Sequence, residues 1–210
     1  NGNSFSPNCE STLLPAGQAP LQATAVTGLP GLAEEVATGL SHACVRVDGR
    51  VLCWGSNADG ELGDGTTTAS ATPVRAQLPA DDAVALSAGD GFTCAIRRNR
   101  SVWCWGTGEH AAVGTSVSRS TVPVVVPNVS DAIAITSGRW HTCVRHADEG
   151  VSCWGDNTQG QAGAASAEFI LAARVVGLTG VRAISASIES TCALRDTGAI
   201  QCFGNAPEGA

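Results

Sequence analysis

Short segments that alternate between apolar and polar residues recur along the chain, and no segment carries a sustained helical period. In the first clear case, Val45-Arg46-Val47 and Arg50-Val51-Leu52 flank Asp48-Gly49. An Asp-Gly pair between two alternating segments is a strong signal for a two-residue β-hairpin, because both turn residues need a positive φ. Apolar stretches such as 83–86 and 132–135 precede other segments of this kind. The pattern predicts an all-β chain of short strands.

This strand pattern repeats with a period of about fifty residues. Each unit holds two cysteines close together, and the second cysteine is followed by an aromatic residue and a glycine. The four pairs are Cys44 and Cys53, Cys94 and Cys104, Cys143 and Cys153, and Cys192 and Cys202. Periods of 20–50 residues are typical of solenoids, propellers and arrays. The repeats therefore predict an array of similar β-units.

The hairpin register sets the two cysteines of each unit opposite one another. Counting outward from Val47 and Arg50 places Cys44 across from Cys53, within the range of a disulfide. The other units have one more residue between the cysteines, which a three-residue loop such as Asp196-Thr197-Gly198 accommodates. Both loop lengths preserve the facing pair. This favours four disulfides and an oxidising compartment over zinc, since no CxxC motif is present and no histidine completes a ligand set in each unit.

The outer part of each unit is rich in glycine and proline. Residues 54–63 and 154–163 agree closely and carry three glycines each, which indicates tight turns. The segments Thr72-Pro73-Val74 and Val122-Pro123-Val124 follow. Proline in a strand-like run indicates a sheet edge. The outer segments are therefore predicted to be the fourth, outermost strands.

The repeat frame divides the chain into a single repeat domain of five segments. These are an N-terminal segment 1–23, three full repeats at 24–73, 74–123 and 124–173, and an incomplete fourth repeat at 174–210. Pro20 lies about one period before Pro73, so the N-terminal segment is interpreted as the outer part of a repeat. It is predicted to complete the last unit in cis, or a neighbour's unit in trans. A piece of a larger propeller is the remaining alternative.

Cys9 is left over after the four pairs. A free or capped thiol, a partner in sequence not present, and an intermolecular disulfide are the alternatives for it. The chain begins at Asn1 and shows no signal peptide, so it is interpreted as a processed product or a fragment.

Composition narrows the classes of function. The 210 residues include 12 arginines, no lysine and 19 acidic residues, for a net charge of −7. This acidic balance argues against nucleic-acid binding, which depends on clustered cations. No apolar run approaches the roughly 20 residues that span a bilayer, so membrane insertion is not expected. The hydrophobic content of 43% is too high for a disordered chain.

The repeats resemble those of the regulator of chromosome condensation family. The resemblance rests on a small residue and a histidine before the hairpin, then Trp-Gly-x-Asn and Gly-Gln-Leu-Gly after it. Here these motifs are Gly39-Leu40-Ser41-His42, Gly138-Arg139-Trp140-His141, Trp54-Gly55-Ser56-Asn57 and Gly60-Glu61-Leu62-Gly63. The second and fourth repeats depart from the pattern, with Phe92 and Ser190 at the histidine position.

The resemblance implies a β-propeller of four-stranded blades. Members of the family include an exchange factor for a small nuclear GTPase, a secreted inhibitor of β-lactamase and many bacterial surface proteins. Family propellers usually have about seven blades, so four repeats fall short. Hairpin cysteines are not the eukaryotic pattern, and they indicate a secreted bacterial variety.

Few residues suggest chemistry. His42 and His141 occupy equivalent positions, which favours a structural hydrogen bond over catalysis, and no catalytic, metal or cofactor site is predicted. Trp103 and Trp105 fall on one face of a hairpin, and Trp105 belongs to the repeat motif, so packing is expected for it. Trp103 and Trp140 do not recur and are predicted as a contact surface.

These observations predict a secreted, non-enzymatic β-propeller that binds a protein or serves as a structural scaffold. The alternative is a subunit that assembles with copies of itself into an extracellular fibre or surface layer through its N-terminal strand. The expected location is extracellular, at the cell surface or in the periplasm. Nothing in the sequence identifies the ligand.

Overall fold

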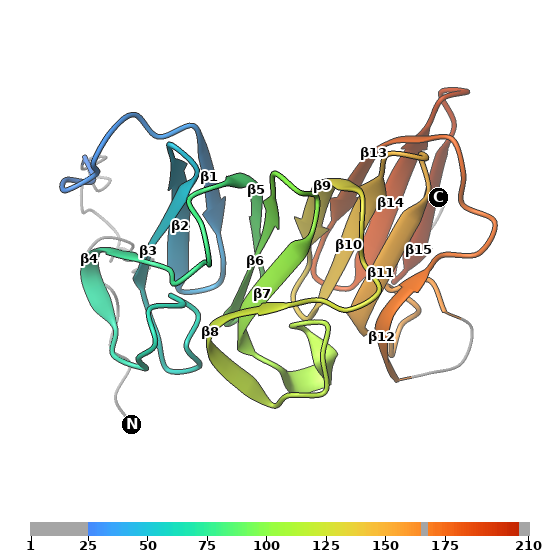
Figure 1. Ribbon diagram of the computed structural model, residues 1–210. Coiled ribbons are helices and arrows are strands. Elements are labelled where there is room, and N and C mark those ends of the chain that lie inside the picture. The colour runs from blue at the N-terminus through green and yellow to red at the C-terminus, as the bar shows by residue number, and fades with distance from the viewer. Residues whose placement is uncertain (1–24, 165–167, 206–210) are drawn as a thin grey trace, which may run out of the picture.

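The computed structural model describes residues 25–164 and 168–205. Within them, the β-strands form four separate antiparallel sheets, one from each sequence repeat. The sheets stand side by side as the blades of an open arc, with blade 1 at one end and blade 4 at the other (Figure 1). A short 3-10 helix, η1 (Glu109–Ala111), lies in the loop after β7. The architecture confirms the predicted all-β propeller.

Each blade takes its strands from consecutive parts of the chain, and the first strand is innermost. Blade 1 consists of β1 (Glu35–Thr38), β2 (His42–Val47), β3 (Arg50–Gly55) and β4 (Ser70–Arg75). Blade 2 consists of β5 (Ala83–Ala88), β6 (Phe92–Arg97), β7 (Val102–Thr107) and β8 (Arg119–Val125). Blade 3 consists of β9 (Ala132–Ser137), β10 (His141–His146), β11 (Val151–Asp156) and β12 (Phe169–Arg174). Blade 4 consists of β13 (Val181–Ala186), β14 (Ser190–Arg195) and β15 (Ile200–Gly204).

The outermost strands sit where the prolines predicted them. Pro73 lies in β4 and Pro123 in β8, each at the edge of its sheet. Blade 4 has three strands among the described residues, so within them the outer edge of β15 has no paired strand. The predicted closing segment 1–23 and Cys9 lie outside the described residues.

The central hairpins have the register that the turn chemistry predicts. Asp48 has a φ of 49° and Gly49 a φ of 75°, and Cys44 faces Cys53. The three-residue loops end on a residue with positive φ, which is Arg100, Glu149 or Gly198. Each facing pair of cysteines forms a disulfide, with Cα atoms 4.0–4.1 Å apart. Two loop lengths therefore lead to the same cross-strand link.

Every blade has two faces, and between neighbouring blades the forward face of one packs against the backward face of the next. The forward face points to the next blade and carries the disulfide, and the backward face carries the aromatic residue after the second cysteine. Between blades 1 and 2, Val51 and the Cys44–Cys53 disulfide pack against Ala95 and Trp105. Similar clusters join blade 2 to blade 3 and blade 3 to blade 4. Alternation along each strand thus divides one hydrophobic core into layers between blades.

The repeated tryptophan also links blades by a hydrogen bond. The indole N–H of Trp105 donates to the carbonyl of Glu61 at 2.8 Å, and that of Trp154 donates to the carbonyl of Ala112 at 3.0 Å. Both acceptors lie in the turn that follows the third strand of the preceding blade. The packing role predicted for Trp105 is confirmed, since its side chain is fully buried.

Two buried histidines make further polar links between blades. The Thr93 hydroxyl donates to the carbonyl of Glu61 at 3.0 Å, so its oxygen accepts from Nε2 of His42 at 2.8 Å. His141 and Thr191 repeat this arrangement between blades 3 and 4. Burial lowers the pKa of both histidines to about 4. The structural hydrogen bond predicted for the two histidines is confirmed.

The ring at this position requires glycine three residues earlier. A Cβ added to Gly138 would lie 2.2 Å from Cε1 of His141, and one added to Gly89 would lie 2.1 Å from Cε1 of Phe92. Blade 4 changes both positions together, because Ser187 and Ser190 stand there and their hydroxyls lie 2.8 Å apart. The departure of the fourth repeat is therefore a matched pair of substitutions.

Candidate binding face

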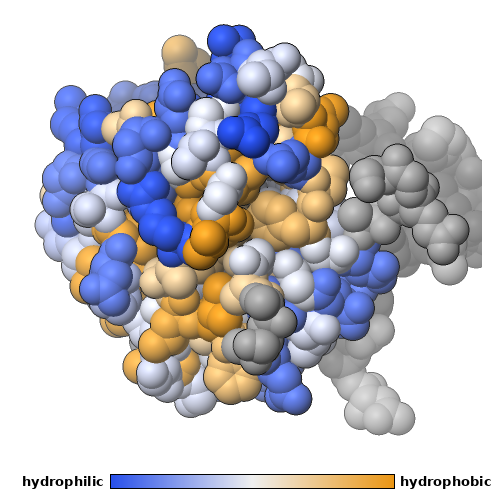
Figure 2. Space-filling model, turned by 90° about the vertical axis from the view of Figure 1, so that its right-hand side faces the viewer, coloured by the Kyte–Doolittle hydropathy of each residue, from blue (hydrophilic) through white to orange (hydrophobic). Residues whose placement is uncertain are grey.

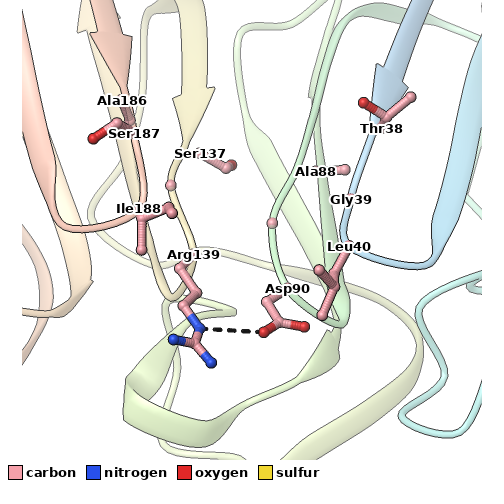
Figure 3. Close-up of a pocket in the computed structure, with 12 residues that line it drawn as sticks. Thr38, Gly39, Leu40, Ala88, Asp90, Ser137, Arg139, Ala186, Ser187 and Ile188 are labelled. Carbon is pink, nitrogen blue, oxygen red and sulfur yellow. Dashed lines mark hydrogen bonds and ion pairs between the residues drawn. The ribbon is translucent and has the colours of Figure 1, made fainter. Parts of the chain in front are cut away.

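One face of the arc, which we call the loop face, gathers loops from all four blades. Antiparallel order brings the loops after β1, β5, β9 and β13 to this face, together with the long loop 108–118 after β7. The four short loops surround a cavity of about 330 Å³ at the centre of the arc (Figure 3). Each blade contributes three consecutive positions, at 38–40, 88–90, 137–139 and 186–188.

The central cavity is apolar and carries one ion pair. Leu40 and Ile188 line it and are 75% and 64% exposed. Nε of Arg139 donates to Oδ2 of Asp90 at 3.4 Å, as the dashed line in Figure 3 shows. The backbone N–H of Asp90 also donates to the carbonyl of Arg139 at 2.9 Å. The cavity can therefore accept an apolar group while a charged pair stands beside it.

Trp140 extends this surface away from the centre. The guanidinium carbon of Arg139 lies 4.1 Å from the centroid of its ring, a cation–π contact. The ring of His110 stacks on Trp140 with centroids 4.8 Å apart and an angle of 16° between planes. Because Arg139 lines the central cavity and His110 lines a second one, Trp140 connects the two.

The second cavity, of about 420 Å³, lies between blades 2 and 3. The loop 108–118 forms one wall, and Phe169 and Leu171 of β12 form the other. These two side chains are about half exposed, at 55% and 48%. Large exposed apolar side chains beside a cavity are typical of binding surfaces rather than of an ordinary solvated strand.

The loop that presents His110 is strained. His110 has a φ of 54° and Ala111 a φ of 58°, a region that costs a residue with a Cβ about 1–2 kcal/mol. The matching turns of blades 1 and 3 have Gly60 and Gly160 where Ala111 stands, with φ of 83° and 82°. Strain of this kind concentrates at functional sites. This strained turn distinguishes the loop of blade 2 from the matching loops of blades 1 and 3 on the loop face.

Replacing Ala111 with glycine is expected to raise the free energy of unfolding by about 1 kcal/mol, because glycine adopts positive φ without the steric cost. Urea denaturation followed by circular dichroism measures the change. Ala112→Gly is the matched control, since Ala112 has a φ of −57° and should lose stability. Equal destabilisation by Ala111→Gly and Ala112→Gly would contradict backbone strain at Ala111.

The structure does not bring Trp103 and Trp140 together. Trp103 shares the backward face of blade 2 with Trp105, as predicted, and packs partly buried against the cluster between blades 1 and 2. Its indole N–H donates to the Ser101 hydroxyl at 3.1 Å, and the Arg97 guanidinium carbon lies 5.6 Å from the ring centroid. Trp140 lies on the loop face instead.

Several residues of the loop face were not singled out from the sequence. Their signal was the variable position after the recurring small residue, which is Leu40, Asp90, Arg139 or Ile188 in the four repeats. No sequence signal marked Phe169 and Leu171, because an apolar strand residue gives the same sequence pattern whether it is exposed or buried.

Asp148 belongs to an ion pair on the surface. Hydrogen bonds from Arg174, two of 2.9 Å, and one from the backbone of Gly150 lower the pKa of Asp148 to about 2. Over residues 25–164 and 168–205, no three His, Cys, Asp or Glu side chains are grouped to hold a metal ion. No helix in the same part of the chain is long and apolar enough to cross a membrane.

Two models of the regulator of chromosome condensation (RCC1) repeat match the chain, one at residues 48–96 and the other at 34–61, 83–111 and 132–161. Together they cover about half of the chain and fall on blades 1 to 3. The chain belongs to the RCC1 repeat family. Within the RCC1 repeats, the matched ranges include the hairpins that carry the first three disulfides.

Two solved structures share the arrangement of blades. Yeast RCC1 (Prp20), solved bound to Kap60, superposes with a TM-score of 0.75 at 15% identity, over 85% of this chain and 45% of that one. Human WBSCR16 gives a TM-score of 0.75 at 22% identity, over 84% and 48%. The chain thus spans about half the length of these proteins, and the likeness establishes the fold.

A curated relative matches over a shorter stretch. The ultraviolet-B receptor UVR8 of Arabidopsis thaliana is 31% identical over 81 residues, which are 37% of this chain and 18% of the receptor.

Proposed function

We propose that this RCC1-repeat chain is a non-enzymatic module that binds a protein partner through its loop face. The observation that carries the proposal is the strip formed by Asp90, Arg139, Trp140 and His110 between two cavities. Tryptophan and arginine are the residues that most often dominate protein–protein binding energy. Yeast RCC1 was solved in complex with a protein, Kap60, which supports this class of partner.

We further propose that the protein works in an oxidising compartment, as a secreted bacterial protein. Four disulfides within short hairpins support this location, because cytosolic thiols are kept reduced. The net charge of −7 argues against a nucleic-acid partner.

Selection of displayed peptides on the immobilised, oxidised protein tests the binding proposal. We expect enriched peptides whose affinity falls roughly tenfold or more with Trp140→Ala, because the indole is the central anchor. Arg50→Ala, at the hairpin end of blade 1, is the control and should leave affinity unchanged. Peptides that bind Trp140→Ala as well as the unmodified protein would contradict the loop face as the site.

Self-assembly is the second candidate function. The observation that favours it is the three-stranded blade 4, whose last strand has no paired neighbour among the described residues. An exposed sheet edge pairs readily with a strand from another chain. The N-terminal segment of a neighbouring copy would supply that strand in an extracellular fibre or surface layer.

A further inference from the structure

Charge is divided unequally between the two faces of the arc. The hairpin face, opposite the loop face, holds the turns that join the second and third strands of each blade. Ten of the 12 arginines lie in these turns, in the linkers between blades or in the strand ends beside them, together with nine acidic residues. The loop face has two arginines, Arg119 and Arg139. It also has six acidic residues that are not buried, Asp59, Asp64, Asp90, Glu109, Glu168 and Glu189.

Ion pairs neutralise the hairpin face but leave the loop face negative. Of the seven ion pairs in the part of the chain that the structure describes, six join residues of the hairpin face. The seventh is the pair of Arg139 and Asp90 on the loop face. Glu109 is exposed and uses only its backbone in the hydrogen bonds that it makes with other described residues. Its carboxylate is therefore available to a partner.

The second cavity places this carboxylate beside apolar walls. Glu109 lines the cavity together with Phe169, Leu171 and Val117, and each of these three apolar side chains is about half exposed. Such a cavity suits an arginine or lysine side chain, because the aliphatic stem covers apolar surface while the charged end reaches a carboxylate. The exposed ring of Phe169 can also contact a cation.

We propose that the loop face binds a cationic segment of a protein partner, which places an arginine or lysine side chain in the second cavity. This inference rests on the proposed function and names the chemistry of the partner. The stem of the basic side chain packs against Phe169 and Leu171, and its charge pairs with Glu109. The segment then crosses Trp140 toward the apolar central cavity, which accepts one of its apolar side chains.

An acidic partner fits this surface less well. Arg139 is already paired with Asp90 and stacked on Trp140, and a guanidinium N–H of Arg119 donates to the carbonyl of Ala58 at 3.3 Å. An acidic segment would therefore find both arginines engaged and would meet carboxylates that lack an ion pair. Like charges brought together across an interface oppose binding.

Blade 4 carries another exposed apolar surface, away from these cavities. Ile200 is 70% exposed and Leu194 is 40% exposed, although the residues at these positions in blade 2, Val102 and Ile96, are fully buried. Figure 2 looks onto this end of the arc and shows apolar residues gathered in the middle of the face. Ile200 is the first residue of β15 and lies beside the turn 196–199, on the hairpin face. Ile200→Ala therefore tests whether a peptide binds blade 4 instead.

Fluorescence anisotropy with three labelled peptides tests the charge of the partner, using the full, oxidised chain. The peptides share one glycine–leucine–X repeat of equal length, in which X is arginine, glutamine or glutamate. We expect the arginine peptide to bind roughly tenfold or more tightly than the glutamine peptide, and the glutamate peptide to bind most weakly. Because salt screens charges, the advantage of the arginine peptide should shrink as the ionic strength rises.

Two glutamate variants separate the cavity from the net charge. Glu109→Gln should weaken the arginine peptide roughly three- to tenfold and leave the affinity of the glutamine peptide nearly unchanged. Glu149→Gln is the matched control, since Glu149 is also exposed, lies in the turn 147–150 on the hairpin face, and changes the net charge by the same amount. Phe169→Ala should weaken the arginine peptide as well, whereas Ile200→Ala should not. Circular dichroism and four intact disulfides establish that each variant is folded.

The other outcomes separate this inference from the function on which it rests. Equal weakening by Glu109→Gln and Glu149→Gln would overturn the second cavity as the site, and so would weakening by Ile200→Ala without weakening by Phe169→Ala. Peptides that bind regardless of their charge but lose affinity with Trp140→Ala would overturn the cationic partner and retain the loop face. If no synthetic or displayed peptide loses affinity with Trp140→Ala, both this inference and the proposed function are wrong.

Discussion

Replacing Trp154 with alanine is expected to lower the free energy of unfolding by about 4 kcal/mol. The side chain is fully buried in the cluster between blades 2 and 3, where it packs with Phe92 and Val144. The substitution leaves a large cavity and also removes the hydrogen bond to the carbonyl of Ala112. Urea denaturation with linear extrapolation measures the loss.

Two further variants separate packing from hydrogen bonding. Trp154→Phe imitates Phe203 of blade 4 and should cost about 1–3 kcal/mol, because apolar contact remains while a buried carbonyl loses its donor. Trp140→Ala should cost less than about 1 kcal/mol, since this side chain is only partly buried on the loop face. If Trp154→Ala cost no more than Trp140→Ala, the repeated tryptophan would not be what joins the blades.

Acidification from pH 7 to pH 4 is expected to remove about 3 kcal/mol of stability for each of His42 and His141. Burial lowers the pKa of both from 6.5 to about 4 in the folded protein. The unfolded chain therefore binds protons below pH 6.5 while the folded chain does not. The contribution is fully present above pH 6.5 and is lost as the pH falls toward 4. Nδ1 of His141 is buried without a hydrogen-bond partner, so a proton added there would have no acceptor.

The chain itself supplies the control for this pH dependence. Phe92 occupies the histidine position of blade 2 and is buried against blade 3. His42→Phe together with His141→Phe should flatten the dependence of unfolding free energy on pH between 6.5 and 4. His146, whose pKa burial also lowers, stays in both proteins and cancels in the comparison. An unchanged slope would show that carboxylates control the acid response.

The sequence by itself determined the internal structure of each blade. The turn residues Asp48 and Gly49 and the spacing of the cysteines specify hairpin register, because that register depends only on a few neighbouring residues. The repeated Trp-Gly motif likewise predicted which aromatic residues would be buried. Pro73 and Pro123 marked the outer strands, since proline lacks the N–H that an inner strand needs.

Only the tertiary structure decided which loops meet and which faces remain exposed. His110 and Trp140 come from different blades, and their contact depends on the curvature of the arc and on the strained turn at Ala111. Leu194 and Ile200 have the same apolar character as their buried counterparts, so the pattern along the chain does not distinguish them. Packing between blades is set by many weak contacts between distant residues, and it therefore becomes visible only when the blades are placed in space.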